Sequence, residues 1–239
     1  MILELKGITK NFGGLRALNS VDIVCEKGRI IGLIGPNGAG KTTLFNCITG
    51  FLKITKGSVL FEGNDISGKK PNRICQLGIA RSFQITKNFG EMSVLENVMV
   101  GSFLRVGQND TLKARDIAMN TLEFTGLASK KDQRTKNLTI PDRKRLGLAS
   151  SLATHPKILL LDETMAGLRP YEVDEVASLL KKIAIESDIT LIVIEHIMRA
   201  IMNISNKIVV LDYGTKIAEG TPYEISKNPK VIEAYLGRD

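Results

Sequence analysis

The chain has 239 residues, of which 43% are hydrophobic, so it can bury the core of one large domain or of a main domain with a smaller appendage. No apolar run approaches the roughly 18 to 20 residues that cross a bilayer. The N-terminus, MILELKG, has neither a basic region nor a cleavage-like site, so we expect a cytoplasmic chain. The net charge is +8, but the basic residues are scattered and aromatic residues are sparse, which favours a solvated surface lying near a membrane over a nucleic-acid-binding protein.

The N-terminal part of the chain predicts an antiparallel group of strands. Residues 2–10 and 21–25 alternate apolar and polar side chains, and residues 57–61 close the group. A loop at residues 11–14 carries one aromatic ring, Phe12. This ring is either a core side chain or a platform on which adenine stacks.

The stretch GPNGAGKTT at residues 35–43 matches the pattern G-x-x-x-x-G-K-[ST] between a predicted strand at 29–34 and a predicted helix at 41–48. Glycines let backbone N–H groups turn inward around an anion, and the start of the helix adds its positive dipole end. We expect Lys41 to reach the β- and γ-phosphates of a nucleotide and the Thr42 hydroxyl to hold Mg²⁺. The alternative is a glycine-rich turn that binds nothing. The expected loop contacts are Gly35, Pro36, Asn37, Gly38, Ala39, Gly40, Lys41, Thr42 and Thr43.

The middle of the chain changes from strands to helices. A helix is predicted near residues 71–77, followed by a strand at 79–83 that delivers Gln84. From residue 91 to 151 we find no strand pattern, and Ser93-x-x-Glu96 forms a capping box. This block is the predicted smaller subdomain. Its other predicted helices cover 111–124 and 141–153.

Two apolar runs in the C-terminal part predict buried strands of a parallel sheet. Residues 158–161 deliver Asp162 and Glu163, and residues 189–194 end at Glu195 and His196. Ligands bind at the carboxyl ends of such strands. The remaining predicted elements are a helix at 170–184, a hairpin of 207–212 with 215–218, and helical turns over 221–236.

This order of motifs resembles the nucleotide-binding subunit of an ATP-binding cassette (ABC) transporter, over nearly the whole chain. Residues 11–18, 78–84, 94–98 and 233–237 are similar to the subunit that serves branched-chain amino acid importers. The resemblance implies an α/β fold: a P-loop NTPase core with a mostly parallel sheet flanked by helices, an N-terminal antiparallel β-subdomain and a helical subdomain. We expect residues 1–84 and 152–239 to form the RecA-like core with the β-subdomain, and residues 85–151 to form the helical subdomain with the signature segment.

The resemblance also implies roles for individual residues. Phe12 stacks on adenine, and Gln84 lies near Mg²⁺ and the attacking water. Asp162 holds Mg²⁺, largely through water, and Glu163 is the general base that deprotonates the attacking water. His196 is the switch residue that hydrogen-bonds the γ-phosphate. The cofactors implied are ATP and Mg²⁺.

The family's signature segment, Leu-Ser-Gly-Gly-Gln, which contacts the ATP of the opposite subunit, is altered here. Thr139 keeps the expected hydroxyl, but Pro141 removes one backbone N–H. Asp142 adds a negative charge. At about 5 to 6 Å from a phosphate, its repulsion is on the order of 3 kcal/mol unless Arg143 or Lys144 screens it, so the sequence predicts that Asp142→Gln raises ATPase activity. The matching residues are Leu138, Thr139, Ile140, Pro141 and Asp142.

The resemblance implies an ATPase motor on the inner face of the cell membrane, bound to permease subunits, served indirectly by an extracytoplasmic solute-binding protein, and without a nucleic-acid partner. Thr164 and Arg169 also depart from the family pattern where two subunits meet. The altered signature at Pro141 and Asp142 favours a heterodimer with a second ABC ATPase subunit, with a homodimer as the alternative. Other interpretations are a weakly hydrolysing, nucleotide-gated subunit, a transporter of urea or amides, and a soluble ABC ATPase of DNA repair or translation.

Overall fold

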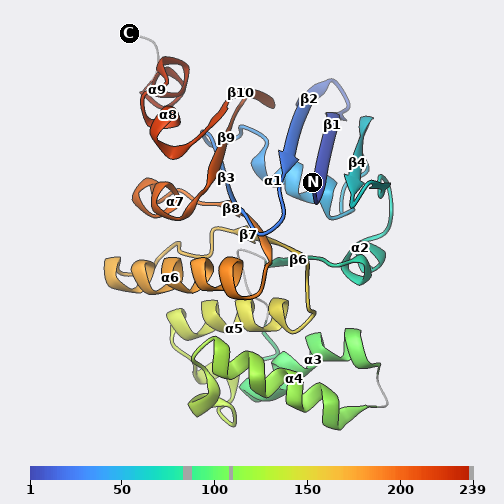
Figure 1. Ribbon diagram of the computed structural model, residues 1–239, viewed down its shortest axis with the longest axis vertical. Helices are drawn as coiled ribbons and strands as arrows, with labels where there is room; N and C mark the ends of the chain where they lie inside the picture. Colours follow the sequence, from blue (N-terminus) through green and yellow to red (C-terminus); the bar gives the residue numbers. More distant parts are fainter. Residues whose placement is uncertain (83–87, 108–109, 237–239) are drawn as a thin grey trace.

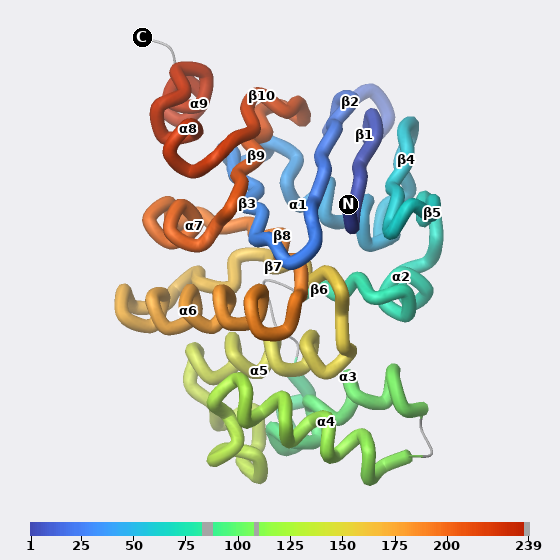
Figure 2. Tube along the Cα trace, viewed as in Figure 1, coloured from blue at the N-terminus to red at the C-terminus, as the bar shows by residue number. Residues whose placement is uncertain are grey.

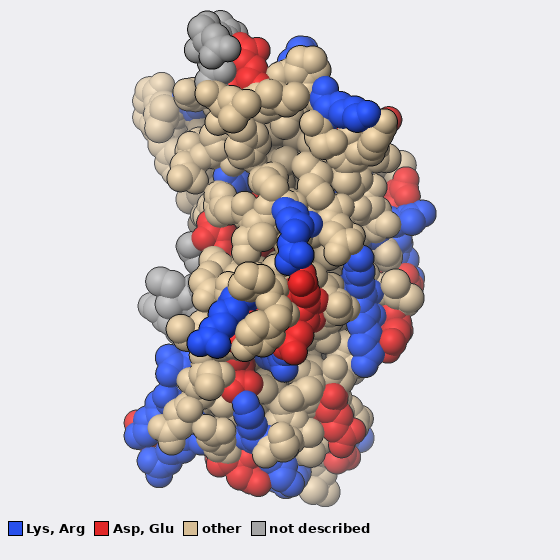
Figure 3. Space-filling model, turned by 90° about the vertical axis from the view of Figure 1, so that its left-hand side faces the viewer, with Lys and Arg blue, Asp and Glu red and all other residues tan. Residues whose placement is uncertain are grey.

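The computed structural model describes residues 1–82, 88–107 and 110–236. Within these ranges, no helix combines the length and the apolar character needed to cross a bilayer. Figure 1 shows two sheets in the upper part of the molecule and a group of helices below them. On the face drawn in Figure 3, basic and acidic side chains are interspersed over most of the surface, as their scatter in the sequence predicts.

The N-terminal strands form an antiparallel sheet in the order β2-β1-β4-β5. Leu3 of the first strand pairs with Cys25 on one side and with Phe61 on the other, which confirms the predicted antiparallel group. The short strand β5 was not predicted. The strands are β1 (Leu3–Phe12), β2 (Leu15–Cys25), β4 (Lys56–Phe61) and β5 (Asn64–Asp65).

The second sheet has the order β10-β9-β3-β8-β7-β6 and positions the glycine-rich loop of residues 35–43, the predicted phosphate loop. Its strands β9, β3, β8, β7 and β6 are parallel, and β10 is antiparallel to β9. Every residue of β3, β7 and β8 is buried, as their continuous apolar sequences predict. The strands are β3 (Ile30–Ile34), β6 (Ile79–Ser82), β7 (Ile158–Asp162), β8 (Thr190–Ile194), β9 (Lys207–Asp212) and β10 (Thr215–Gly220).

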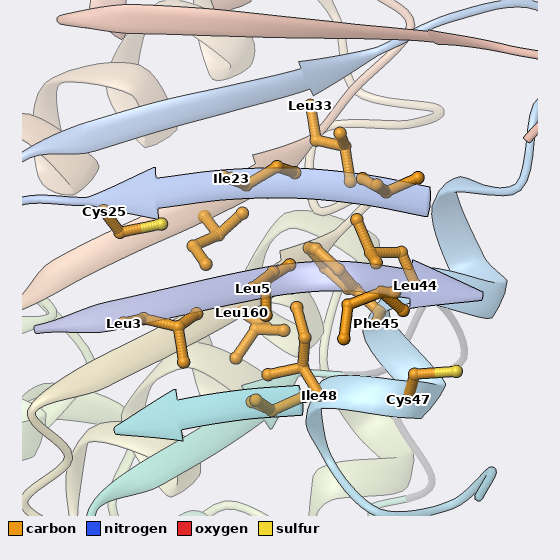
Figure 4. Close-up of a cluster of buried hydrophobic side chains, with 14 of the residues drawn as sticks. Leu3, Leu5, Ile23, Cys25, Leu33, Leu44, Phe45, Cys47, Ile48 and Leu160 are labelled. Atoms are coloured by element: carbon orange, nitrogen blue, oxygen red, sulfur yellow. The ribbon is translucent and has the colours of Figure 1, made fainter. Parts of the chain in front are cut away.

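Helix α1 (Lys41–Ile48) lies between the two sheets. Its buried Phe45 belongs to one apolar cluster with Leu5 of β1 and Leu33 of β3 (Figure 4). The opposite face of the parallel sheet is covered by α6 (Pro170–Glu186) and α7 (Met198–Ile204), which belong to a second cluster. Packing on both faces fixes the sheet, and with it the ends of β3, β7 and β8. The other helices beside the sheets are α2 (Pro71–Leu77), α8 (Pro222–Ser226) and α9 (Pro229–Leu236).

Helices α3 (Val94–Val106), α4 (Thr111–Phe124) and α5 (Ile140–Leu152) pack around a third apolar cluster of their own. They lie together at the lower end of the molecule in Figure 2. The predicted capping box at the start of α3 is present, since Ser93 accepts from the Glu96 N–H at 3.1 Å and Glu96 accepts from the Ser93 N–H at 2.7 Å. Short 3₁₀ turns at Ala128–Lys130 and Thr135–Asn137 connect α4 to α5.

Candidate functional site

The glycine-rich loop leaves the end of β3 and enters α1 at Lys41, so the predicted order of strand, loop and helix is confirmed. Gly38 and Gly40 have positive φ angles of 81° and 98°. A Cβ atom on Gly40 would lie 2.8 Å from the Ala17 carbonyl oxygen, so a larger residue does not fit there. No side chain of the described residues caps the start of α1. The first backbone N–H groups of α1 therefore have no side-chain acceptor, which leaves them available to bind an anion.

The side chain of Lys41 turns back into this loop. Its ammonium donates to the carbonyl oxygens of Gly35, 2.7 Å away, and Pro36, 2.9 Å away. Burial lowers the pKa of Lys41 below its ordinary value, while the charges of Glu163 and Asp162 oppose that shift. The cation predicted to meet phosphate thus lies within the loop and within electrostatic reach of both acids.

Asp162, the last residue of β7, forms a buried ion pair with Arg81 of β6, with Arg81 Nη2 2.6 Å from Asp162 Oδ2. The second terminal nitrogen of the guanidinium group, Nη1, donates to Asn46 Oδ1 of α1 at 2.5 Å. Arg81 thereby fixes the position of Asp162 relative to the helix that follows the phosphate loop. No role of Arg81 was predicted from the sequence, although an arginine in a buried strand requires an acidic partner.

Glu163 and His196, predicted as base and switch, are brought together. His196 Nε2 lies 3.0 Å from Glu163 Oε1. Glu163 has a φ of 50°, a left-handed conformation that side chains rarely adopt, and its N–H donates to the carbonyl of Ile194 at 2.9 Å. Such strain concentrates at functional sites, where the surrounding structure holds it in place. Here the end of β8 holds Glu163, and β8 also delivers His196.

Glu195, which precedes His196, is a buried carboxylate that sequence reasoning named only as a strand end. Its Oε1 accepts from the Met165 N–H at 2.7 Å and from the Thr164 hydroxyl at 3.3 Å. Burial raises the pKa of Glu195, against the opposing effect of these hydrogen bonds. Thr164, one of the departures from the family pattern, thus supplies a hydroxyl that the usual proline lacks. In the sequence, the feature that could have identified Glu195 is a charged residue placed directly after an apolar strand.

Lys144 of α5 also reaches this region, whereas the sequence suggested it only as a residue that could screen Asp142. Its ammonium donates to the backbone carbonyl of Glu163 at 3.0 Å. The contact joins the helix that begins with the signature segment to the acid predicted as the base, within one chain.

Phe12 is at the end of β1 and its side chain is 43% exposed, so the core alternative is wrong. Lys10 Nζ lies 4.8 Å from the centre of the Phe12 ring. An exposed ring is available for stacking. Gln84, the other predicted site residue from this half of the chain, lies outside the described residues.

The altered signature segment forms the start of α5, away from α1 in Figure 1. Thr139 is the N-cap, and its hydroxyl both donates to Asp142 Oδ2 at 2.6 Å and accepts from the Asp142 N–H at 3.4 Å. Lys130 Nζ lies 2.5 Å from the same carboxylate oxygen. Burial by itself raises the pKa of Asp142, but the hydrogen bonds from Lys130 and Thr139 outweigh it and hold the pKa below its usual value.

The partner of Asp142 is therefore Lys130, and not Arg143 or Lys144 as the sequence suggested. Arg143 instead donates to the carbonyl oxygens of Leu138 and Lys136 at 3.0 and 2.9 Å. Ionic pairing within the chain removes much of the repulsion that we expected Asp142 to exert.

The sequence was compared with known proteins. A family model described as "ABC transporter" matches residues 18–166, and one described as "Branched-chain amino acid ATP-binding cassette transporter" matches residues 215–239. The chain is 39% identical to the high-affinity branched-chain amino acid transport ATP-binding protein BraF of Pseudomonas aeruginosa and 40% identical to the corresponding LivG protein of Escherichia coli. Each match covers 99% of this chain and 98% of the relative.

Solved structures agree with the sequence relatives. A nucleotide-free ATP-binding cassette from an ABC transporter superposes with a TM-score of 0.89 at 33% identity, and so does an ATP-binding cassette in an ADP conformation. Both matches cover 99% of each chain. The fold, the phosphate loop and the full-length relatives agree: this chain belongs to the ABC transporter family, as an ATP-binding cassette.

Proposed function

We propose that this chain is the ATP-hydrolysing motor of a transporter that takes up branched-chain or related amino acids. Relatives about 40% identical over nearly their whole length bear the name of branched-chain amino acid transport, which supports this solute class. Urea and amides are the alternative solutes. The observation that carries the hydrolytic role is the contact of Glu163 with His196, beside the phosphate loop.

In this proposal the phosphate loop, residues 35–43, holds ATP through its backbone N–H groups and through Lys41. The Lys41 ammonium leaves the carbonyl oxygens of Gly35 and Pro36 to meet the β- and γ-phosphates. The exposed ring of Phe12 stacks on adenine.

The oxygen ligands beside the loop fit Mg²⁺, which prefers hydroxyl, carboxylate and water oxygens. Thr42, in the first turn of α1, supplies a hydroxyl, and Asp162 supplies a carboxylate whose Oδ2 is held by Arg81. When bound there, Mg²⁺ would neutralise charge that develops on the phosphates. Gln84 is the third proposed member of this set.

Glu163 is the proposed general base. Its carboxylate accepts a proton from the water whose oxygen bonds to the γ-phosphorus, while the bond from that phosphorus to the ADP oxygen breaks and ADP leaves with the electron pair. His196 holds the carboxylate in the nucleotide-free chain and donates an N–H to the γ-phosphate when ATP is bound. Because Glu163 is held in a strained backbone conformation by β8, its carboxylate is preorganised for this task.

A weakly hydrolysing, nucleotide-gated subunit is the second candidate, and one observation favours it. The hydroxyl of Thr139 is already bonded to Asp142, and Pro141 offers no N–H, so this signature has fewer donors for the phosphate of an opposing subunit. We infer that the chain pairs with a second ABC ATPase subunit in a heterodimer, docks on permease subunits at the cytoplasmic face of the membrane, and is served indirectly by an extracytoplasmic solute-binding protein.

Two substitutions test the assignment of the site. Lys41→Ala should abolish ATP binding, because the loop loses its cation, whereas Glu163→Gln should keep ATP binding and lose turnover by at least about a hundredfold. Equilibrium binding of radiolabelled ATP and phosphate release from the assembled transporter measure the two effects. Lys56→Ala, at an exposed position of β4, is the control for the loss of a cation. Wild-type ATP affinity in Lys41→Ala, or unchanged turnover in Glu163→Gln, would contradict the assignment.

A further inference from the structure

The C-terminal helix α9 contacts the phosphate loop through one side chain. The N–H of Gly35, the first residue of the loop, donates to the hydroxyl oxygen of Tyr235 at 2.8 Å. The two residues are 200 positions apart in the sequence. None of the roles discussed above uses this contact.

Gly35 is held tightly on its other sides as well. Its carbonyl oxygen accepts from Lys41 Nζ at 2.7 Å. A Cβ atom at this position would lie 2.0 Å from the carbonyl oxygen of Leu211, so the backbone of Gly35 is packed against β9. Residue 35 is thus the fixed entry to the loop, with β9 on one side and α9 on the other.

Nucleotide binding alters one of these restraints. A phosphate drawn into the loop competes with the carbonyl oxygens of Gly35 and Pro36 for the Lys41 ammonium. If Lys41 turns to the phosphate, the bond from Gly35 to Tyr235 is a restraint that can remain on the first peptide of the loop. We propose that Tyr235 is a positioning residue, whose hydroxyl keeps the phosphate loop in its nucleotide-binding conformation and makes nucleotide affinity depend on the docking of α9.

The packing of α9 supports this dependence. Val231 is the one buried residue of this helix, so few apolar contacts oppose its displacement. A hollow of about 670 Å³ lies between the tip of the loop at Pro36 and Asn37 and the α9 residues Lys230 and Glu233. Beside this hollow, the side chain of Tyr235 extends from α9 to the loop, and its hydroxyl holds the loop there through the hydrogen bond from Gly35.

The test is Tyr235→Phe, which removes one oxygen atom and keeps the ring. Titration of the purified full-length chain with ADP and with ATP, both with Mg²⁺, should show affinities weaker by roughly threefold to tenfold, the net effect of one hydrogen bond. Both nucleotides should be affected alike, because the contact lies at the entry to the loop. The Gly35 amide should exchange its hydrogen faster in Tyr235→Phe, while the melting temperature of the nucleotide-free chain should stay within about 2 °C.

The matched control is Tyr223→Phe. Tyr223 lies on the neighbouring α8, and its hydroxyl accepts from the exposed Lys227 at 2.5 Å. This variant should bind both nucleotides like the wild type. Wild-type nucleotide affinity in Tyr235→Phe, or an equal loss in Tyr223→Phe, would overturn the proposal. The inference rests on the proposed nucleotide binding by the loop, and Lys41→Ala distinguishes failure of that binding from failure of the role of Tyr235. If Lys41→Ala loses nucleotide binding while Tyr235→Phe does not, only the role of Tyr235 fails.

Discussion

Glu195 shows how a single buried residue connects the parts of the site. Its backbone joins β8 to His196, while its carboxylate accepts from Met165 and Thr164, directly after Glu163. Glu195 therefore links the segment that carries His196 to the segment that follows Glu163. Because Glu195 is 1% exposed, its charge is costly to bury, and the two hydrogen bonds offset only part of that cost.

The raised pKa of Glu195 predicts a pH-dependent effect of Glu195→Gln on stability. Glutamine accepts the same hydrogen bonds without a charge. Near and below pH 4.5, the ordinary pKa of this carboxyl group, wild type and variant should melt at similar temperatures, because Glu195 is protonated in the folded chain. As the pH rises through the folded-state pKa, the wild type loses the stability that protonation gave it. The melting temperature of Glu195→Gln should therefore exceed that of the wild type by about 2–4 °C at pH 7.5.

Thermal denaturation at pH 4.5 and at pH 7.5 measures this difference. Glu123→Gln, at an exposed position of α4, is the control for the loss of a carboxylate and should give no comparable rise of the melting temperature at pH 7.5. A lower melting temperature of Glu195→Gln at pH 7.5 would show that the charge itself, paired with the Met165 N–H, stabilises the site.

At the scale of elements, the sequence predicted most of the fold because its local signals agree with the packing. The bounds of α1, α2 and α4 match the predicted ranges, each fixed by a phosphate loop, a first-turn proline or an N-cap aspartate. The helix α7 was missed, because its seven residues span too few turns to show a period and no side chain caps its start. Two-residue strands such as β5 carry no pattern at all.

The site was predictable only in part, for a related reason. Motifs identify Lys41, Asp162 and Glu163, because their spacing to a strand end is local. The partners of these residues come from distant segments, as when Arg81 pairs with Asp162 and Tyr235 reaches Gly35. No local pattern in a single sequence encodes such pairs.

The exposed face near the start of α3 is the expected docking surface of the permease. Phe89 and Val100 have 56% and 46% of their surface exposed. Leu104, one turn after Val100 on the same helix, is 37% exposed as well. A group of exposed apolar side chains, unlike a single one, indicates a contact with another protein. Phe89→Cys and Val100→Cys should therefore crosslink to a membrane subunit in the assembled, transporting complex. Ile185→Cys, exposed on α6, should remain unlinked. If neither Phe89→Cys nor Val100→Cys forms crosslinks in an active complex, the permease does not dock on this face.

At the scale of the whole molecule, the phosphate loop and the signature segment belong to separate regions of one chain. The loop lies between the two sheets, while the signature begins α5 in the helical group with its own apolar cluster. In the proposed dimer, each ATP is held by the loop of one subunit and the signature of the other. A homodimer would place the altered signature in both sites, and a heterodimer would leave one site with an unaltered signature.

A helper copy of this chain tests the pairing directly. It carries Lys41→Ala, so it holds no ATP of its own, together with a restored signature: Thr139→Ser, Ile140→Gly, Pro141→Gly and Asp142→Gln. Mixed with the wild type, this helper can contribute only a signature, and we expect turnover per wild-type chain to rise roughly tenfold or more, since restored backbone donors stabilise charge on the transferring phosphoryl group. A helper with Lys41→Ala alone should give no rise.

Asp142→Gln by itself should raise turnover less than twofold, against the expectation from sequence, because Lys130 already neutralises Asp142. Cooperative, rapid hydrolysis by the pure wild type, with no response to the helper, would show that the altered signature is fully competent and that the heterodimer is not required.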